Sequence, residues 1–310
     1  MTRTQIDPSL SSGLTTFAAP VNIVDNGGME IWQRGSTFTN AVSGAYSADR
    51  WKQAGNTTAH VISQDSTFVD SGQYSFKWNI TSTTGASIYQ QETIENYQAY
   101  LGKTVTLSMR IKATAPIQIW LTDGLVATYS ASHPGDNQWH TISITATISN
   151  SATALGTAFG FSTISTSTGT YYIDSIMLVN GSTAATFVPT HPAVDLTRCQ
   201  RYYETYGAGA PPICGVPYNN AAGTQAICDL NLPYKVTKRV NPALTITMTQ
   251  VIDNVPAPGA NTPVTDTPAW SATNNSGDLN VAALQLTRAG ALASARVISA
   301  QFTMTVSADL

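Results

Sequence analysis

The sequence predicts an all-β protein with one short linking helix, and three observations support this prediction. Apolar and polar residues alternate with a period of two in many short runs, which is typical of half-buried strands. Clusters of Gly, Ser, Asn and Pro separate these runs and mark turns. Charged residues make up 11% of the 310 residues, about half the usual ~25%, and Thr and Ser are abundant where the helix formers Glu and Lys are scarce.

The first half of the chain contains five such runs and predicts a β-jelly-roll sandwich over residues 21–190. In the first run Tyr74, Phe76, Trp78 and Ile80 share one face. The five runs cover residues 74–81, 105–113, 117–124, 140–148 and 169–179. Residues 1–20 are too short and polar to form a core and are predicted to be an extended arm that a partner orders.

The period changes after residue 190, which predicts a linker helix over residues 191–207. Asp195 suits the N-cap, and Gly207 lies where a helix would end. The residues at helical spacing are Leu196, Cys199, Tyr203 and Tyr206. Four more alternating runs, at 224–232, 242–252, 278–287 and 295–310, predict a C-terminal β-sandwich over residues 208–310.

Charge and hydropathy argue against several classes of partner. The formal net charge of −3, without a basic cluster, predicts no binding to nucleic acid. No apolar run approaches the ~20 residues that span a bilayer, so no membrane insertion is expected. The first twenty residues contain no continuous apolar region, and we expect no signal peptide there.

The sequence also lacks the motifs that carry common catalytic chemistry, and it predicts no enzyme. No GxSxG, P-loop, GxGxxG or HExxH pattern is present, and the carboxylates are scattered. His133 lies beside Asp136 in a Pro-Gly-Asp-Asn stretch and is predicted to be part of a surface turn. The three cysteines, Cys199, Cys214 and Cys228, form no CxxC pair and are predicted to be buried free thiols in a chain folded in a reducing cytoplasm.

Aromatic residues are the better candidates for a binding function. Trp120, Tyr129 and Trp139 lie in or near the predicted strands of the first domain. Rings of this kind stack on the apolar faces of sugars, while neighbouring polar groups fix the orientation of the ligand. Trp120 is out of phase with Ile117 and Ile119 and would face away from them. The alternative is that these rings belong to the core.

Four segments, in the same order, resemble a family of bacteriophage tail-fibre and related virion proteins. They are NGGMEIWQRGSTF with GAYSADRW at residues 26–51, YYIDSIMLVNGSTAATFVPTHPAVDLTRCQRYYE at 171–204, LNLPYKVTKRVNPALTI at 230–246 and VSADL at 306–310. The resemblance implies that the first domain is similar to the jelly rolls of carbohydrate-binding modules. It implies no cofactor beyond a structural calcium ion, which such modules hold at positions that match Asn26, Glu30 and Asp174. The alternative for Asp174 is a bond to neighbouring backbone.

The first of these segments is predicted to be a structural corner. Trp32, Arg34, Asp49, Arg50 and Trp51 match the opening pattern of the family, which is not a catalytic set. We expect Trp32 and Trp51 to cover one end of the sandwich. We expect Arg34 or Arg50 to pair with Asp49 where the chain turns.

The resemblance predicts a virion structural protein, assembled in the host cytoplasm. The first interpretation is a homotrimeric tail fibre that docks on other virion proteins through residues 1–20 and contacts bacterial surface polysaccharide. The second is a head fibre or cement protein that decorates the capsid. The third is the carbohydrate-binding part of a secreted glycan-degrading enzyme, against which the missing acid pair weighs.

Overall fold

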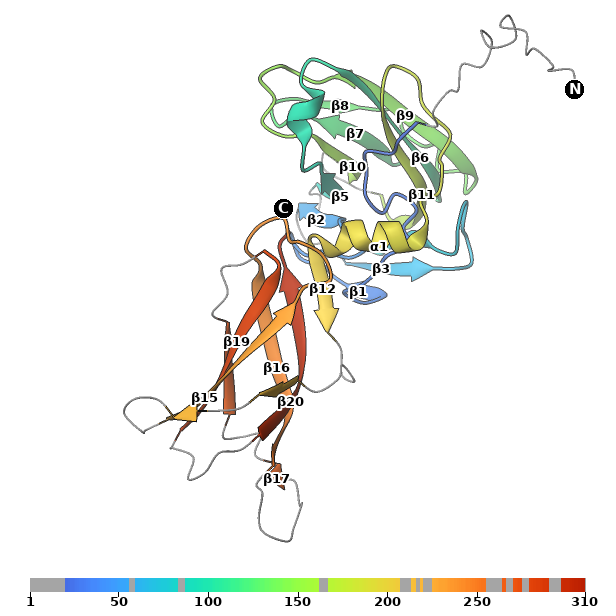
Figure 1. Cartoon of the computed structure of the whole chain (residues 1–310). Helices are drawn as coiled ribbons and strands as arrows, with labels where there is room; N and C mark the ends of the chain where they lie inside the picture. The colour runs from blue at the N-terminus through green and yellow to red at the C-terminus, as the bar shows by residue number, and fades with distance from the viewer. Residues whose placement is uncertain are drawn as a thin grey trace, which may run out of the picture.

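The computed structural model describes two β units joined by one helix (Figure 1). The described residues are 20–55, 59–82, 87–161, 167–206, 213–215, 218–219, 225–254, 264–265, 270–274, 279–289 and 297–309. The predicted arm, residues 1–20, lies outside them except for Pro20. The predicted all-β class, with one short helix between two β regions, is confirmed. No helix among the described residues is long and apolar enough to cross a membrane.

The first unit is a sandwich of two antiparallel sheets. The six-stranded sheet has the order β1 (Thr37–Thr39), β3 (His60–Asp65), β4 (Ser75–Ile80), β11 (Gly169–Asn180), β6 (Thr104–Ala113) and β9 (Trp139–Thr147). The five-stranded sheet has the order β2 (Lys52–Gly55), β5 (Ile88–Thr93), β10 (Gly156–Phe161), β7 (Gln118–Thr122) and β8 (Ala127–Tyr129). A 3-10 helix, η2 (Tyr97–Tyr100), connects β5 to β6.

The core of this unit lies between the two sheets and is built by the alternation that the sequence displays. Phe76, Trp78 and Ile80 of β4 point into it, as do Val105, Leu107, Met109 and Ile111 of β6. Ile119 and Leu121 of β7 close it from the other sheet. The residues between them face outward, so each sheet has an outer face that the core does not use.

The helix α1 (Pro192–Gln200) is shorter than predicted. His191 is its N-cap, and its Nδ1 accepts a hydrogen bond of 3.2 Å from Ala193 N, while Pro192 occupies the first helical position. Asp195 is therefore inside the helix and not its cap. Residues Tyr203–Tyr206 form strand β12, which pairs with the last strand about a hundred residues later. That distant pairing satisfies their backbone groups and overrides the helical spacing.

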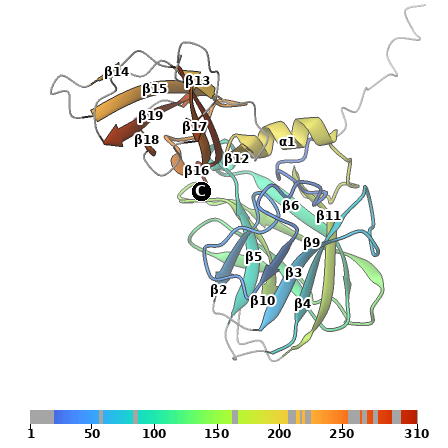
Figure 2. The same ribbon diagram turned by 90° about the horizontal axis from the view of Figure 1, so that it is seen from below.

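The C-terminal unit also contains two antiparallel sheets (Figure 2). The first has the order β12, β20 (Val297–Ser307), β16 (Ala243–Asn254) and β17 (Val264–Thr265), with β13 (Ile213–Gly215) also paired to β20. The second has the order β14 (Tyr218–Asn219), β15 (Gln225–Pro233), β19 (Val281–Ala289) and β18 (Trp270–Asn274). Its core includes Cys228, Leu230, Leu284, Leu286, Phe302, Met304 and Val306.

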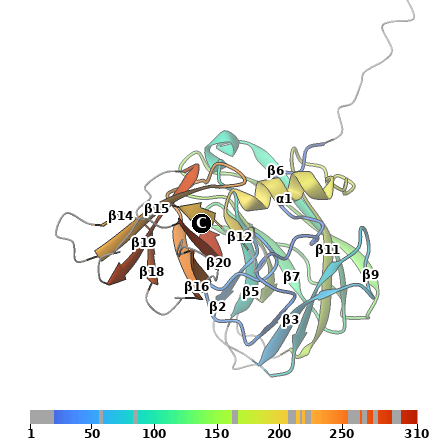
Figure 3. The ribbon, with the colours of Figure 1, turned by 60° about the horizontal axis from the view of Figure 1, so that its bottom comes forward.

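The helix lies along the first sandwich and leads into β12 beside the C-terminal strands (Figure 3). Cys199, in the last turn of α1, is buried there as a free thiol, and Cys228 is a buried free thiol of the second unit. Burial raises the pKa of the Cys199 thiol well above its ordinary value, so this group is not a reactive thiolate. The side chain of Cys214 lies outside the described set.

Candidate functional site

The outer face of the five-stranded sheet carries a row of three aromatic rings. Trp120 on β7 faces away from the core, while its neighbours Ile119 and Leu121 belong to it. Its ring centroid lies 5.0 Å from that of Tyr89 on β5 and 5.5 Å from that of Tyr129 on β8. The prediction that Trp120 points to the opposite face from its apolar neighbours is therefore confirmed.

Strand β10 forms a low floor between Tyr89 and Trp120. Its outward positions are Gly156, Ala158 and Gly160, and Ala158 lies directly opposite Trp120 in the pairing register. Gly160 has a φ of 140°, and a Cβ there would lie 2.6 Å from the carbonyl oxygen of Ile88. Only glycine fits that position. The small residues let the two large rings approach each other across the strand.

The three rings differ in what they offer to a ligand. Trp120 is 5% exposed, because the two tyrosines cover it, whereas Tyr129 is 43% exposed. Tyr129 is thus the ring that presents a free surface, and Trp120 is the support that holds it. Gln91 of β5 lies on the same face and is half-buried, so amide and aromatic groups are both within this face.

Trp139 does not belong to this row. It lies on β9, opposite Lys112 of β6, on the outer face of the six-stranded sheet. The guanidinium of Arg110 lies over its ring at 6.0 Å. The three candidate binding residues from the sequence are therefore divided between the two outer faces of the sandwich, and only Trp120 and Tyr129 form one cluster.

His133 is buried, so the predicted surface location of this residue is wrong. Its Nδ1 accepts a hydrogen bond of 2.9 Å from Gly135 N, and its Nε2 lies 3.1 Å from Gln138 O. The imidazole thus closes the turn from inside. The Pro-Gly-Asp-Asn stretch is a turn, as predicted, but the histidine that precedes it folds underneath it.

His133, Asp136 and His140 form a group whose potential ligand atoms lie within 4.8 Å of one another, in the part of the chain that the structure describes. Both nitrogens of His133 already have backbone partners. A metal ion on Nε2 would require a proton on Nδ1, which would then face the N–H of Gly135. His140 is bonded to Asp136 at 3.0 Å. This donor set does not fit a metal ion.

Protonation of His133 is expected to destabilise the folded protein. Burial lowers the pKa of its imidazole below the ordinary 6.5. The unfolded chain therefore binds this proton first as the pH falls, so stability is full above about pH 6.5 and decreases below it. Chemical denaturation at several pH values should show a smaller decrease for His133→Asn, which does not titrate. An equal decrease in both proteins would contradict this role.

The three residues that match a calcium site, Asn26, Glu30 and Asp174, all use their side-chain oxygens to accept hydrogen bonds from backbone N–H groups. Asp174 Oδ2 accepts hydrogen bonds from Asp70 N at 2.8 Å and Ser71 N at 3.0 Å. Glu30 Oε1 accepts from Gln73 N at 2.6 Å, two residues further along the same turn. Asn26 lies apart from that turn and bonds to the backbone of Ile31.

This donor set does not fit calcium. The carboxylates of Glu30 and Asp174 face backbone N–H groups, whose partial positive charge repels a cation. Asn26, with a φ of 52°, has its amide committed to the backbone. The structure shows the alternative for Asp174, a hydrogen bond to neighbouring backbone. All three side chains stabilise loops through hydrogen bonds to the backbone.

The two tryptophans of the predicted corner have different positions. Trp32 packs at the edge of the core, 5.7 Å from the ring of Phe76, and its Nε1 donates to Met29 O at 2.7 Å. Trp51 is fully buried inside the core, 5.2 Å from Phe159. The expectation that both cover one end of the sandwich is wrong for Trp51, because this residue, directly before β2, packs in the core between the sheets.

Arg34 of the predicted corner contacts both Asp49 within the corner and residues of the C-terminal unit. Arg34 Nη1 lies 3.8 Å from Asp49, which is the predicted pair, but its Nη2 bonds to Asp309 near the end of the chain. The guanidinium of Arg34 also lies 3.7 Å above the ring of Tyr203. Gln33 Nε2 donates to Tyr203 O at 2.8 Å.

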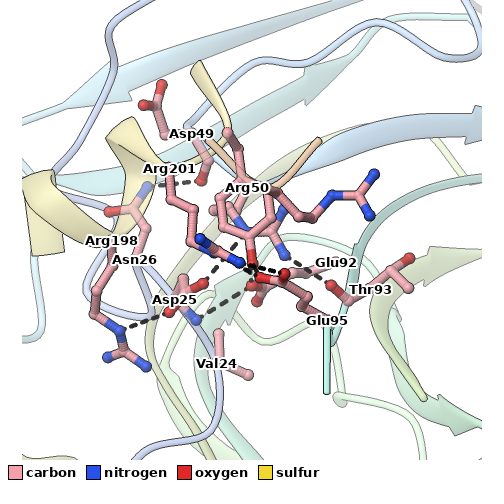
Figure 4. Close-up of polar contacts among 12 residues, drawn as sticks. Val24, Asp25, Asn26, Asp49, Arg50, Glu92, Thr93, Glu95, Arg198 and Arg201 are labelled. Carbon is pink, nitrogen blue, oxygen red and sulfur yellow. Dashed lines mark hydrogen bonds and ion pairs between the residues drawn. The ribbon is translucent and has the colours of Figure 1, made fainter. Parts of the chain in front are cut away.

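Arg50 pairs with partners other than Asp49 (Figure 4). Its Nη2 donates to Thr93 O at 2.7 Å, and its Nε lies 3.4 Å from both Asp25 and Glu92. Its guanidinium lies 3.5 Å above the ring of Tyr202, which follows α1. The prediction that Arg34 or Arg50 would pair with Asp49 thus holds for Arg34, while Arg50 connects the sandwich to the segment after the helix.

Arg198 of α1 and Arg201, the C-cap of the helix, add two further ion pairs to this contact between the sandwich and the helix, which we call the joint; Figure 4 also shows them. Arg198 Nε lies 2.8 Å from Asp25, and Arg201 makes two parallel bonds to Glu95, at 2.8 and 3.0 Å. Arg239 then donates to the carbonyl oxygens of Ala308 and Asp309.

All four segments that resemble phage proteins therefore meet at one joint. The sequence offered no signal for this, because the segments lie up to about 280 residues apart.

The sequence also gave no signal for Tyr89 of the aromatic row. Its strand, β5, has the buried polar residues Gln90 and Glu92 at positions where apolar residues are expected, so the alternation is not visible.

No protein-family model and no curated protein matches this chain. Solved structures with similar folds include the enzymatically active domain of bacteriophage CBA120 tailspike protein 4, with 16% identity and a TM-score of 0.39 over 52% of this chain and 22% of that one. TmCBM61, solved with beta-1,4-galactotriose, has 14% identity and a TM-score of 0.35 over 52% of this chain and 99% of that one.

A third similar structure is the CBM22-1 xylan-binding domain of Paenibacillus barcinonensis Xyn10C, with 8% identity and a TM-score of 0.34 over 54% of this chain and 98% of that one. This chain thus covers less than a quarter of the tailspike domain and nearly all of the two binding modules. Values this low assign neither a family nor a ligand to the chain.

Proposed function

We propose that this chain is a non-enzymatic bacteriophage virion protein that binds glycan on the host surface, as part of a tail fibre. The observation that carries the proposal is the row formed by Tyr89, Trp120 and Tyr129 on the outer face of the five-stranded sheet. The four sequence segments that resemble phage tail-fibre proteins support the virion assignment.

In this proposal the exposed ring of Tyr129 packs against the apolar face of a sugar. Trp120, which itself packs against Tyr89, holds that ring in place, so little side-chain entropy is lost on binding. Gln91 on the same face supplies an amide for sugar hydroxyls. A flat face with a row of rings suits a chain of sugars more than a single enclosed unit.

Replacement of Tyr129 by alanine is expected to weaken glycan binding by roughly tenfold or more, as for a central aromatic contact. The fold should be retained, because this ring is the most exposed of the three. Glycan-array screening followed by calorimetry on the best ligand measures the effect. Tyr218→Ala, which removes an exposed tyrosine of the other unit, is the matched control and should bind as the original protein does.

The same experiment identifies the face. A loss of binding in Trp139→Ala, with Tyr129→Ala unaffected, would move the site to the outer face of the six-stranded sheet and overturn the proposal.

The absence of catalysis is part of the proposal as well. Release of reducing ends from the bound glycan would favour the third interpretation, a part of a glycan-degrading enzyme.

The place of the protein in the virion is tested by cryo-electron microscopy of the particle. Density at the tail tip, in three copies around an axis and attached through residues 1–20, is expected for a homotrimeric fibre. Density over the head would instead favour capsid decoration, with docking as the function of the same arm.

A further inference from the structure

A pocket of about 610 Å³ lies at the joint between the sandwich and the helix. Most of its lining comes from the segment 20–25, the end of β5 with the residues after it, the end of β11, and the last turn of α1 with the residues after it. Arg50, before β2, and Tyr100 of η2 complete the lining. Ile23, Ile94 and Val179 line one part of it, and charged residues line another. This volume falls within the ~300–1,000 Å³ that small-molecule sites occupy. The aromatic row on the five-stranded sheet contributes none of its lining.

The charged part of the pocket contains buried polar atoms without hydrogen-bond partners. Glu92 is 1% exposed; its Oε1 accepts from Asp25 N at 3.2 Å, but its Oε2 has no partner. Arg50 Nε also lacks a hydrogen-bond partner and has only the two ion-pair contacts at 3.4 Å. Unpaired buried groups are costly, and a ligand with oxygen atoms would satisfy them.

Arg198 offers further free donors at the rim. Its Nε pairs with Asp25 at 2.8 Å, and its Nη1 lies 3.9 Å from Asp195, too far for a hydrogen bond. The outer edge of the guanidinium is therefore available for a planar anion, which such a group binds with two parallel bonds. Asn96 and Asn180 lie on the same pocket wall.

The charge balance of the lining also favours an anion. Burial raises the pKa of Glu92 to about 8, so this carboxyl group is mostly protonated at neutral pH. Three guanidinium groups, of Arg50, Arg198 and Arg201, then face two carboxylates, of Asp25 and Glu95. The arginines outnumber the ionised carboxylates of the lining, and Asp195, which lies outside the lining at 3.9 Å from Arg198, offsets part of that excess. This lining suits a ligand with a single negative charge.

We propose that this pocket binds a carboxylate-bearing sugar unit. The carboxylate lies on the outer edge of Arg198, and the sugar hydroxyls bond to Glu92, Asn96 and Asn180. The apolar wall of Ile23, Ile94 and Val179 covers the carbon atoms of the ring. This site is separate from the aromatic row and does not depend on the function proposed for that row.

Two ligands that differ only in the carboxylate test the proposal. Sodium galacturonate and galactose are titrated into the full chain at neutral pH, with binding followed by calorimetry and by saturation-transfer NMR. Galacturonate is expected to bind, and galactose to bind about tenfold more weakly or not at all. Equal binding of the two sugars, or no binding of galacturonate at millimolar concentration, would overturn the proposal.

Matched variants locate the site. Arg198→Gln is expected to weaken galacturonate binding by about tenfold. Arg110→Gln is the control, because Arg110 Nε pairs with Asp70 at the same 2.8 Å and its side chain is 31% exposed, against 35% for Arg198. Asn180→Asp, which adds a negative charge at the rim, should weaken binding without touching the joint. Unchanged binding in both Arg198→Gln and Asn180→Asp would refute this location.

The outcome is distinguishable from that of the proposed function. Tyr129→Ala should lose binding to extended glycan and keep binding to galacturonate. If Tyr129→Ala loses galacturonate as well, the acidic sugar binds on the aromatic row and the pocket proposal fails.

Discussion

Replacement of Arg50 by alanine is expected to lower the free energy of unfolding by about 3–5 kcal/mol, the usual cost of removing one partner of a buried ion pair. Arg50 is almost fully buried and holds a left-handed φ of 74°, unusual for a residue with a side chain. Without it, Asp25 would keep only Arg198 as an ion-pair partner. The carbonyl oxygen of Thr93 would lose a hydrogen bond, and Tyr202 would lose the guanidinium that covers its ring.

The matched control for this prediction is Arg110→Ala. The Arg110–Asp70 pair is partly exposed, and its loss should cost less than about 1 kcal/mol because water screens it. Thermal and chemical denaturation measure both variants. If Arg50→Ala were no less stable than Arg110→Ala, the joint would not depend on this arginine. Increased proteolysis between the two units is a second expected result, because Arg50 connects the sandwich to the segment after α1.

Replacement of Lys238 by alanine is expected to have an effect of similar size, about 3–5 kcal/mol, on the C-terminal unit. Lys238 Nζ lies 3.2 Å from Glu204, and both side chains are fully buried. The same ammonium donates to Gln200 O at the end of α1. Burial lowers the pKa of Lys238, and the carboxylate of Glu204 opposes that shift. Removal of the lysine leaves the glutamate as an uncompensated buried charge.

The double variant Lys238→Met with Glu204→Gln separates this explanation from simple loss of packing. It removes both charges, and the single amide oxygen of glutamine, in the place of Glu204 Oε1, still accepts hydrogen bonds from Tyr206 OH and Lys235 N. We therefore expect the double variant to regain most of the stability that Lys238→Ala loses. Lys77→Ala, which breaks a partly exposed pair with Asp65, is the control with little effect. A double variant as unstable as Lys238→Ala would contradict an electrostatic origin.

The nine runs predicted from the sequence are strands in the structure, with errors of a few residues at their ends, whereas other strands, such as β3, β5 and β10, were not predicted. The run predicted at 105–113 is β6 (Thr104–Ala113), and the run at 242–252 is β16 (Ala243–Asn254). The reason is local: a strand buried on one face needs apolar residues at every second position, and that pattern is visible in one segment alone. Trp120 followed the same rule, because its position out of phase with Ile119 placed it on the outer face.

The helix shows where local reasoning fails. Tyr203 and Tyr206 fit the helical spacing, yet their backbone pairs with β20. His133 fits a surface turn, yet its ring fills the turn from below. In both cases the deciding partner is a backbone group that the sequence pattern does not place.

The sequence by itself determined the all-β class, the positions of nine strands, the outward direction of Trp120 and a set of charged residues around Trp32 and Trp51. Tertiary structure decided what those charges do. Arg34 reaches Asp309, Arg50 reaches Tyr202, and Arg201 reaches Glu95. Strand alternation is a property of neighbouring residues, whereas an ion pair depends on which distant segments the packing of two sheets and a helix brings together.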